Sequence, residues 1–248
     1  MEFDYFERRK IRIEEMKDFK VEAKVFDEKT LFAIYKLMVK KIVKSVESKV
    51  KEGKESVILS GLDYQGKWIA IKVYRILHCD FRNMWKYLVA DPRFSRVKKK
   101  RRDVVLTWVK REFKNLKLAF KGKVNCPKPI AIYENVMVMS FIGKDGIPAP
   151  RLIDAEVDNW EKIYWQIVEE IKKLLKVGLI HGDLSAFNIL FLKKPYLIDF
   201  SQGVRITHPL ALEFLERDVN NINKFFMKLG VKIDENLFGE LKNEFGLR

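Results

Sequence analysis

Three side chains in the second half of the chain combine the residue types and the spacing that a chemical site needs. Asp183 and Asn188 lie within the segment HGDLSAFNIL, residues 181–190, and Asp199 ends the short apolar stretch that follows. A carboxylate can orient a hydroxyl group and accept its proton, while an amide oxygen and a second carboxylate suit Mg²⁺. Asp and Asn also cap turns in ordinary loops. Their fixed spacing here favours a site for phosphoryl transfer.

This segment resembles the catalytic loop of the protein-kinase-like superfamily, H-x-D-L-x-x-x-N, which is followed by a metal-binding Asp at the end of the next strand. On this resemblance the catalytic residues are Asp183 and Asp199, and Asp183 positions the attacking hydroxyl. The metal ligands are Asn188 and Asp199, which would hold Mg²⁺ against the phosphates of ATP.

A lysine in the first half is predicted to bind the phosphates. The strand pattern KWIAIKV, residues 67–73, places Trp68, Ala70 and Lys72 on one face. It matches the A-x-K strand of kinases, in which the small residue leaves room for adenine and the lysine reaches the phosphates. A single lysine on a strand more often extends into solvent. Glu112, on the next long helix, is predicted to be the ion-pair partner of Lys72.

Two further segments are predicted to bind the nucleotide. A loop before the strand 56–62 would cover the phosphates, although it has one glycine rather than the three of G-x-G-x-x-G; its residues are Gly53, Lys54, Glu55 and Ser56. The segment 138–142 is predicted to be the hinge between two lobes, where backbone groups would meet adenine at Met139, Phe141 and Ile142. An ordinary buried strand would have the same composition.

Hydrophobic periodicity predicts the elements that hold these groups. Apolar residues at helical spacing predict helices at 31–46, 103–120, 160–178 and 210–229, with a shorter one near the end. Alternating or short apolar runs predict strands at 56–62, 67–75, 136–142, 189–192 and 196–198. We therefore expect an α/β (α+β) bilobal, protein-kinase-like fold, with a helix and the N-lobe in 1–139 and the C-lobe in 140–248.

The charge of the chain indicates a polyanionic partner. It has 49 Lys and Arg against 34 Asp and Glu, a net charge of +15 that costs self-repulsion. The alternative is the Lys- and Glu-rich surface common in hyperthermophiles. The run RVKKKRR, residues 96–102, is predicted to bind RNA phosphates; the alternative is a solvated charged loop.

Composition predicts a protein of the cytoplasm. The chain is 48% hydrophobic and 33% charged, as in ordinary globular proteins, and its longest apolar run, 136–142, is too short to cross a bilayer. The first ten residues carry charges where a signal peptide would need apolar residues. The two cysteines, Cys79 and Cys126, form no CxxC motif and no disulfide framework.

Several details differ from ordinary protein kinases. Gly182 replaces the Arg that would bind an activation-loop phosphate, and Ser201 replaces the glycine of D-F-G. No A-P-E motif follows, and only 49 residues remain after Asp199. We therefore expect a truncated C-lobe without an activation segment.

Together these features resemble the RIO family of atypical protein kinases, in its type 1 branch, over residues 21–231. The segments that carry the resemblance are Gly53-Lys54-Glu55, Ile71-Lys72-Val73-Tyr74-Arg75-Ile76, Glu112-Phe113-Lys114-Asn115-Leu116, Met139-Ser140-Phe141-Ile142-Gly143, His181-Gly182-Asp183-Leu184-Ser185 and Glu216-Arg217-Asp218-Val219. Three positions differ from the family pattern: Lys51-Glu52 replaces Ser-Thr, which removes two hydroxyl donors, and Ser140 replaces Glu in the hinge.

The resemblance implies ATP and Mg²⁺ as cofactors and a role in maturation of the small ribosomal subunit, with the pre-ribosomal subunit and ribosomal RNA as partners. It also implies an ATPase switch in which the phosphoryl group passes to the metal-binding Asp199. Two alternatives stay open. Phosphotransferases for aminoglycosides, choline or homoserine share H-G-D-L-x-x-x-N, but they are generally acidic and have a larger helical C-lobe. A non-catalytic RNA-binding scaffold could retain an inactive nucleotide site.

Overall fold

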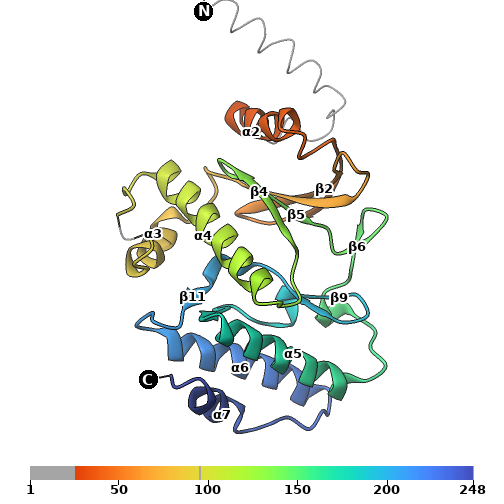
Figure 1. The fold of residues 1–248 in the computed structure, drawn as a ribbon, viewed down its shortest axis with the longest axis vertical. Helices are drawn as coiled ribbons and strands as arrows, with labels where there is room; N and C mark the ends of the chain where they lie inside the picture. Colours follow the sequence, from red (N-terminus) through yellow and green to blue (C-terminus); the bar gives the residue numbers. More distant parts are fainter. Residues whose placement is uncertain (1–25, 95, 248) are drawn as a thin grey trace, which may run out of the picture.

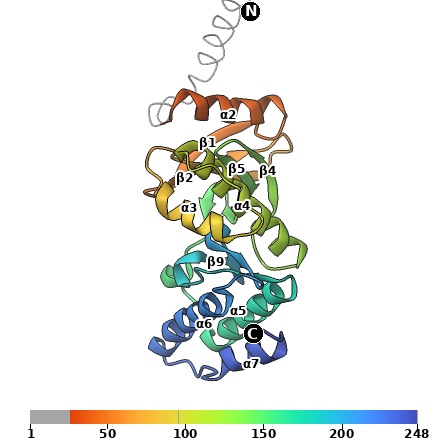
Figure 2. The same ribbon diagram turned by 90° about the vertical axis from the view of Figure 1, so that its left-hand side faces the viewer.

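An antiparallel sheet of five strands forms the upper half of the molecule in Figures 1 and 2. The computed structural model describes residues 26–94 and 96–247. The strand order is β1-β2-β3-β5-β4. These strands span Ser45–Glu52 (β1), Ser56–Leu62 (β2), Trp68–Tyr74 (β3), Pro129–Tyr133 (β4) and Val136–Ser140 (β5). The strands predicted at 56–62 and 67–75 are confirmed as β2 and β3.

The two faces of β3 serve different purposes. Ile69, Ile71 and Val73 pack in a buried cluster with α2 (Glu28–Val39), the helix that lies above the sheet in Figure 2. Because side chains alternate along a strand, Lys72 and Tyr74 point to the opposite face. The sheet therefore separates an apolar layer from the side on which the candidate site is built.

The predicted helix at 31–46 is wrong in its second half. The structure ends α2 at Val39, and Lys41 adopts a positive φ of 56° before β1 begins at Ser45. β1 is an edge strand with no fully buried residue, so its sequence carries no apolar alternation to mark it. Val46, which seemed to continue the helical stripe, instead pairs with Gly61 of β2.

Two helices cross the side of the sheet away from α2. α4 (Arg101–Lys121) matches the predicted helix at 103–120, whereas α3 (Phe81–Ala90) was not predicted. The apolar residues Phe81, Met84, Trp85 and Leu88 of α3 do follow helical spacing, so the sequence carried a signal for α3 that was not used. The edge strand β4 was also not predicted.

The lower half of the molecule is mainly helical. α5 (Trp160–Lys176), α6 (Ala211–Lys228) and α7 (Leu237–Glu244) lie beneath the sheet in Figure 1. Two small antiparallel strand pairs lie between the two halves: the hairpin of β9 (Ile189–Phe191) and β10 (Pro195–Leu197), and the pair of β8 (Leu179–Ile180) with β11 (Val204–Arg205). A further hairpin, β6 (Gly143–Lys144) with β7 (Ile147–Pro148), follows β5. Short 3₁₀ turns complete it: η2 (Leu152–Asp154), η3 (Ala186–Asn188) and η4 (Phe200–Gln202).

The C-terminal part is short after the candidate site. Only η4 and β11 separate Asp199 from the start of α6 at Ala211. This agrees with the predicted absence of an activation segment. None of the helices in the described part of the chain is long and apolar enough to cross a membrane.

Candidate active site

Asp199 lies in an unusual backbone conformation where β10 leads into η4. Its φ of 62° and ψ of 71° fall in the left-handed region, which few residues other than glycine adopt. The conformation lets its carboxylate cap η4 by accepting a hydrogen bond from the Ser201 backbone N–H at 3.4 Å. The side chain is still 41% exposed, so a ligand can reach it. Strain of this kind collects at functional sites.

Lys72 joins Asp199 to α4. Its Nζ lies 2.7 Å from Oε1 of Glu112 and 3.2 Å from Oδ1 of Asp199. The second oxygen of Glu112 accepts a hydrogen bond from the Tyr74 hydroxyl. The structure thus contains the predicted ion pair between Lys72 and Glu112, and both side chains are almost fully buried.

Lys72 and Asp199 hold each other in their ionised forms. Burial lowers the pKa of Lys72, but the carboxylates of Asp199 and Glu112 outweigh it and raise that pKa above its ordinary value. Burial likewise raises the pKa of Asp199, but Lys72 and the Ser201 N–H outweigh it and lower that pKa to about 2. At neutral pH, Lys72 is therefore a cation and Asp199 a carboxylate.

Asp183 and Asn188 form the other half of the site. The side-chain amide of Asn188 donates to the backbone oxygen of Asp183 at 2.8 Å and to its Oδ2 at 3.1 Å. The Ile198 N–H donates to the Asn188 backbone oxygen at 3.0 Å, which ties this loop to the strand before Asp199. Burial, and then the charge of Asp199, raises the pKa of Asp183. A general base is most effective when its pKa lies near the working pH, so a raised pKa makes the Asp183 carboxylate a better proton acceptor.

The donor set of this site fits Mg²⁺ bound together with phosphates. Nowhere in residues 26–94 and 96–247 do three His, Cys, Asp or Glu side chains gather to hold a metal by themselves. The Asp199 carboxylate and the Asn188 amide oxygen offer two oxygen ligands. Protein Mg²⁺ sites often use one or two such ligands and fill the remaining positions with water and substrate phosphates.

The predicted hinge begins opposite the small residue of β3. Ala70 pairs with Met139 across the sheet, and beyond β5 the Phe141 N–H donates to the Trp68 backbone oxygen at 3.3 Å. The Ile142 backbone oxygen accepts from Ala149, whereas its N–H has no hydrogen-bond partner among the described residues. A free backbone N–H in the hinge is a group to which a purine ring could hydrogen-bond.

The loop 53–56 is a tight turn between β1 and β2. The Gly53 N–H donates to the Ser56 backbone oxygen at 2.9 Å, and Lys54 is exposed. Oε1 of Glu55 accepts from the Asp80 N–H at 3.1 Å, at the start of α3. Within the described chain, no hydrogen bond or ion pair links this loop to Lys72, Asp183 or Asp199. The structure thus brings together five of the predicted residues, which are Lys72, Glu112, Asp183, Asn188 and Asp199. The loop 53–56 makes no such contact with them in the described part of the chain.

Comparison with known protein families decides the class of fold and enzyme. The family model of the RIO domain matches residues 57–238, most of the chain. The chain belongs to the RIO family. The match confirms the resemblance found in the sequence. Glu52, which stands where the RIO pattern has a hydroxyl-bearing residue, forms an ion pair with Arg75.

Relatives of this RIO chain are found in archaea. It is 44% identical to the RIO-type serine/threonine-protein kinase Rio1 of Methanocaldococcus jannaschii over 86% of this chain and 73% of that protein. It is 38% identical to the Rio1 of Haloferax volcanii over 94% of this chain and 80% of that protein. These relatives confirm the type 1 branch and the enzyme class, an ATP-dependent phosphotransferase.

A solved RIO structure confirms the fold class. The Rio2 kinase of Chaetomium thermophilum, described as an ADP/Mg²⁺-phosphoaspartate complex, matches with a TM-score of 0.66 and 27% identity. The match covers 85% of this chain and 64% of that one, so this chain spans less than two thirds of that protein's structure. The likeness shows that this chain has the kinase-like fold, here a five-stranded sheet above a helical lobe.

Sequence reasoning gave no role to Asp218 of α6, which binds the backbone of the loop that contains Asp183. Its two carboxylate oxygens accept from the Gly182 and Leu184 N–H groups, each at 2.7 Å. The neighbouring Arg217 donates to the Gly182 backbone oxygen. Gly182 has a φ of 77°, and a Cβ there would lie 2.7 Å from the Gln202 backbone oxygen. The available signal was a carboxylate on the buried stripe of an amphipathic helix.

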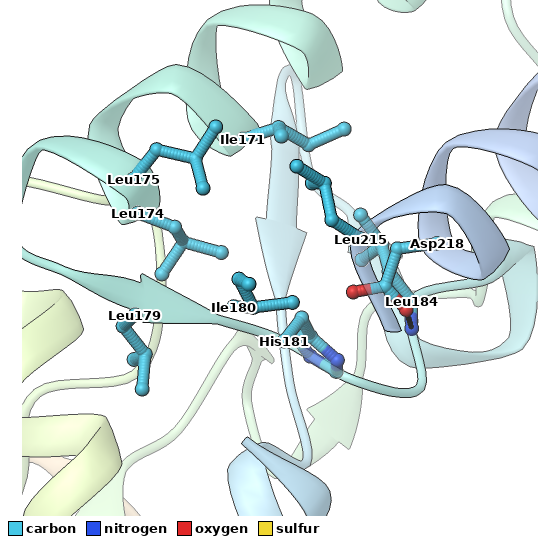
Figure 3. Close-up of a pocket in the computed structure, with 9 residues that line it drawn as sticks. All are labelled: Ile171, Leu174, Leu175, Leu179, Ile180, His181, Leu184, Leu215 and Asp218. Atoms are coloured by element: carbon cyan, nitrogen blue, oxygen red, sulfur yellow. Dashed lines mark hydrogen bonds between the residues drawn. The ribbon is translucent and has the colours of Figure 1, made fainter. Parts of the chain in front are cut away.

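A small cavity lies behind this loop, between α5 and α6 (Figure 3). It is about 10 Å³, near the least volume that holds one water. Leucine and isoleucine side chains surround it, with His181 and Asp218 on one side. His181 Nε2 donates to the Ile198 oxygen at 3.0 Å, and burial lowers the pKa of His181 to about 4. His181 is therefore a neutral structural residue of the loop.

Two residues of α4 hold the segment after Asp199, and sequence reasoning did not find them either. The side-chain amide of Asn115 donates to the Phe200 oxygen at 3.0 Å and to the Gly203 oxygen at 2.8 Å. The fully buried Arg111 donates to the Ser201 oxygen at 3.2 Å. α4 thus fixes both Lys72, through Glu112, and the backbone around Asp199.

Replacing Asp218 by Asn should lower turnover about 10-fold or more, because an amide NH₂ cannot accept one of the two loop hydrogen bonds and the loop then shifts. Stability gives a second readout. Burial raises the pKa of Asp218 to about 7, against about 3.9 unfolded, so the folded state binds the proton more tightly. Wild-type stability should therefore fall as pH rises from about 4 to about 7, and this slope should be weaker in the variant.

Turnover at neutral pH and urea unfolding across this pH range measure the two effects. Glu213→Gln, an exposed change on the same helix, is the control. Unchanged turnover together with an unchanged slope would remove Asp218 from its positioning role.

Proposed function

We propose that this RIO chain is an ATP- and Mg²⁺-dependent atypical serine/threonine protein kinase and ATPase of the cytoplasm. The observation that carries the proposal is the position of Asp199, 3.2 Å from the buried Lys72 and joined through Ile198 to the loop of Asp183 and Asn188. A cation for the phosphates, two oxygen ligands for Mg²⁺ and a positioned carboxylate thus meet in one place. These are the parts that phosphoryl transfer requires.

Each residue then has a defined task. The free Ile142 N–H and the space beside Ala70 would receive the adenine ring. Lys72 would neutralise phosphate charge, and its tie to Glu112 holds it in place. Bound Mg²⁺ would supply further positive charge on the phosphates. Asp183 would orient the attacking hydroxyl or water and accept its proton.

We propose further that Asp199 is phosphorylated transiently. A carboxylate oxygen of Asp199 attacks the γ-phosphorus, the bond to the β,γ-bridging oxygen breaks, and ADP leaves with the electron pair. Water oriented by Asp183, which accepts its proton, then attacks the phosphorus. The bond from phosphorus to Asp199 breaks with its electron pair left on the carboxylate, and inorganic phosphate leaves. The low pKa of Asp199 and its 41% exposure support this role. So does the phosphoaspartate named for the Chaetomium Rio2 structure. The rival is that Asp199 serves only as a metal ligand while the phosphoryl group passes to water or a protein hydroxyl.

We place this activity in maturation of the small ribosomal subunit, with ribosomal RNA as partner. The net charge of +15 and the family resemblance support that setting. The short segment between Asp199 and α6 leaves little room for a peptide platform. ATP hydrolysis would then time release from a ribosomal precursor.

The covalent intermediate is tested with radiolabelled ATP. Acid-quenched protein should carry label that hydroxylamine removes, because an acyl-phosphate is labile to it and phosphoserine is not. Asp199→Ala should carry none of this label. Label that survives hydroxylamine, or that persists in Asp199→Ala, would leave direct transfer as the mechanism.

Two other functions are separated by turnover. A small-molecule phosphotransferase should release more ADP when an aminoglycoside or choline is added. A non-catalytic scaffold should bind RNA but turn over no ATP.

A further inference from the structure

The outer face of α4 carries a row of lysines. Between residues 110 and 121 the exposed positions of this helix are Lys110, Lys114, Lys117, Phe120 and Lys121. Steps of three and four residues place the lysines in one stripe along the helix. At 1.5 Å per residue the stripe is about 16 Å long. We call these four lysines the lysine ridge.

The lysine ridge has no acidic counterpart. The acidic residues of α4 are Asp103, in the first turn, and the buried Glu112. No salt bridge reaches a ridge lysine within the described residues; the ammonium groups of Lys114 and Lys117 lie over the rings of Phe94 and Phe113. Solvated helix faces usually alternate Glu and Lys, because like charges at these spacings repel. The ridge is therefore a stripe of cations with room for external anions.

The basic run 96–102 offers fewer free cations than its sequence suggests. Arg101 donates to the backbone oxygens of Leu77 and Cys79 at 3.1 and 2.9 Å, which docks α4 onto the segment before α3. Arg102 forms an ion pair with Glu134. The exposed members of the run are Arg96 and Lys98–Lys100.

We propose that the lysine ridge, with Phe120 at its end, binds a single strand of RNA. The inference deepens the RNA partner proposed above by assigning it a surface. Lysines three or four residues apart are spaced about 5–6 Å along the helix, comparable to successive phosphates of a flexible strand. Phe120 is 43% exposed and offers a ring on which a base can stack. Stacking needs bases, and this favours RNA over an acidic protein.

Binding of a fluorescently labelled single-stranded RNA of mixed sequence to the full chain, without nucleotide, tests the ridge. The ridge variant replaces Lys110, Lys114, Lys117 and Lys121 by Gln. The control replaces Lys162, Lys224, Lys228 and Lys232 by Gln; these are exposed lysines of the helical lobe. Both variants change the net charge equally. The ridge variant should bind about 100-fold more weakly at low salt, and its salt slope should fall by about 0.7 for each lost contact.

Phe120→Ala separates RNA from other polyanions. It should weaken RNA binding about 5-fold or more and leave binding of inorganic polyphosphate unchanged. A Lys98, Lys99 and Lys100→Gln variant should weaken RNA binding less than the ridge variant does.

The ridge is excluded if its variant binds RNA as tightly as the control variant, or if the control loses as much affinity. If Phe120→Ala leaves RNA binding unchanged, the occupant is a phosphate-rich partner without base stacking and the RNA assignment fails. Because no ATP is present, none of these results depends on phosphoryl transfer. Turnover of the wild type, measured separately, tests the proposed enzyme.

Discussion

Replacing Asp183 by Asn should cut ATP turnover by about 100-fold or more while nucleotide affinity stays within several-fold of wild type. Asn keeps the size of the side chain and an oxygen that can accept from the Asn188 amide. It loses the negative charge and the ability to accept a proton from the attacking hydroxyl. The contacts proposed for the nucleotide, at Lys72, Ile142 and the metal ligands, are unaffected. Nucleotide titration and steady-state turnover measure the two quantities.

A matched control is Asp158→Asn, which removes one carboxylate from an exposed position far along the chain from the catalytic loop. It should turn over ATP at the wild-type rate. Near-wild-type turnover in a folded Asp183→Asn protein would show that Asp183 is not the proton acceptor of the reaction.

Lys72→Met should destabilise the protein by about 3–5 kcal/mol, because it leaves the buried Glu112 without its cation. Removing the second charge should reverse much of this loss. In Lys72→Met/Glu112→Gln the amide can still accept from the Tyr74 hydroxyl, and no unpaired buried charge remains. Urea unfolding of the single and double variants gives the comparison. A loss below about 1 kcal/mol in the single variant, or no recovery in the double, would contradict it.

The same variant has a predicted pH dependence. Burial already raises the pKa of Glu112, and Lys72 opposes that rise. Without Lys72 the folded pKa moves higher, while the unfolded value stays at about 4.3. The stability deficit of Lys72→Met should therefore shrink as pH falls toward about 4 and grow as pH rises above it. The double variant should lack this dependence.

Sequence reasoning found the parts of the site that have local signatures. Asp183 and Asn188 belong to one short segment, and the alternation around Lys72 fixed both its strand and its face. The pairing of Lys72 with Glu112 followed from the order of strand and helix and is present in the structure. The family comparison confirms the fold and enzyme class that these segments indicated.

The missing parts depend on contacts between distant segments. Asp218 of α6 binds Gly182, which lies 36 residues earlier in the sequence. Asn115 of α4 binds Gly203, which lies 88 residues later. No spacing in the sequence encodes such pairs. β1 was missed for a different reason, since it buries few side chains and so shows little periodicity. α3 does show helical spacing of its apolar residues, and that signal was overlooked.

The two faces of α4 have a consequence for how the protein would respond to its partners. The inner face carries Glu112 and Asn115, which hold Lys72 and the backbone beyond Asp199. The outer face carries the lysine ridge. If RNA and nucleotide each favour one position of this helix, their bindings are thermodynamically linked, and RNA must change nucleotide affinity by the same factor by which nucleotide changes RNA affinity. Through this one helix, the change from bound ATP to bound ADP would then weaken the binding of RNA.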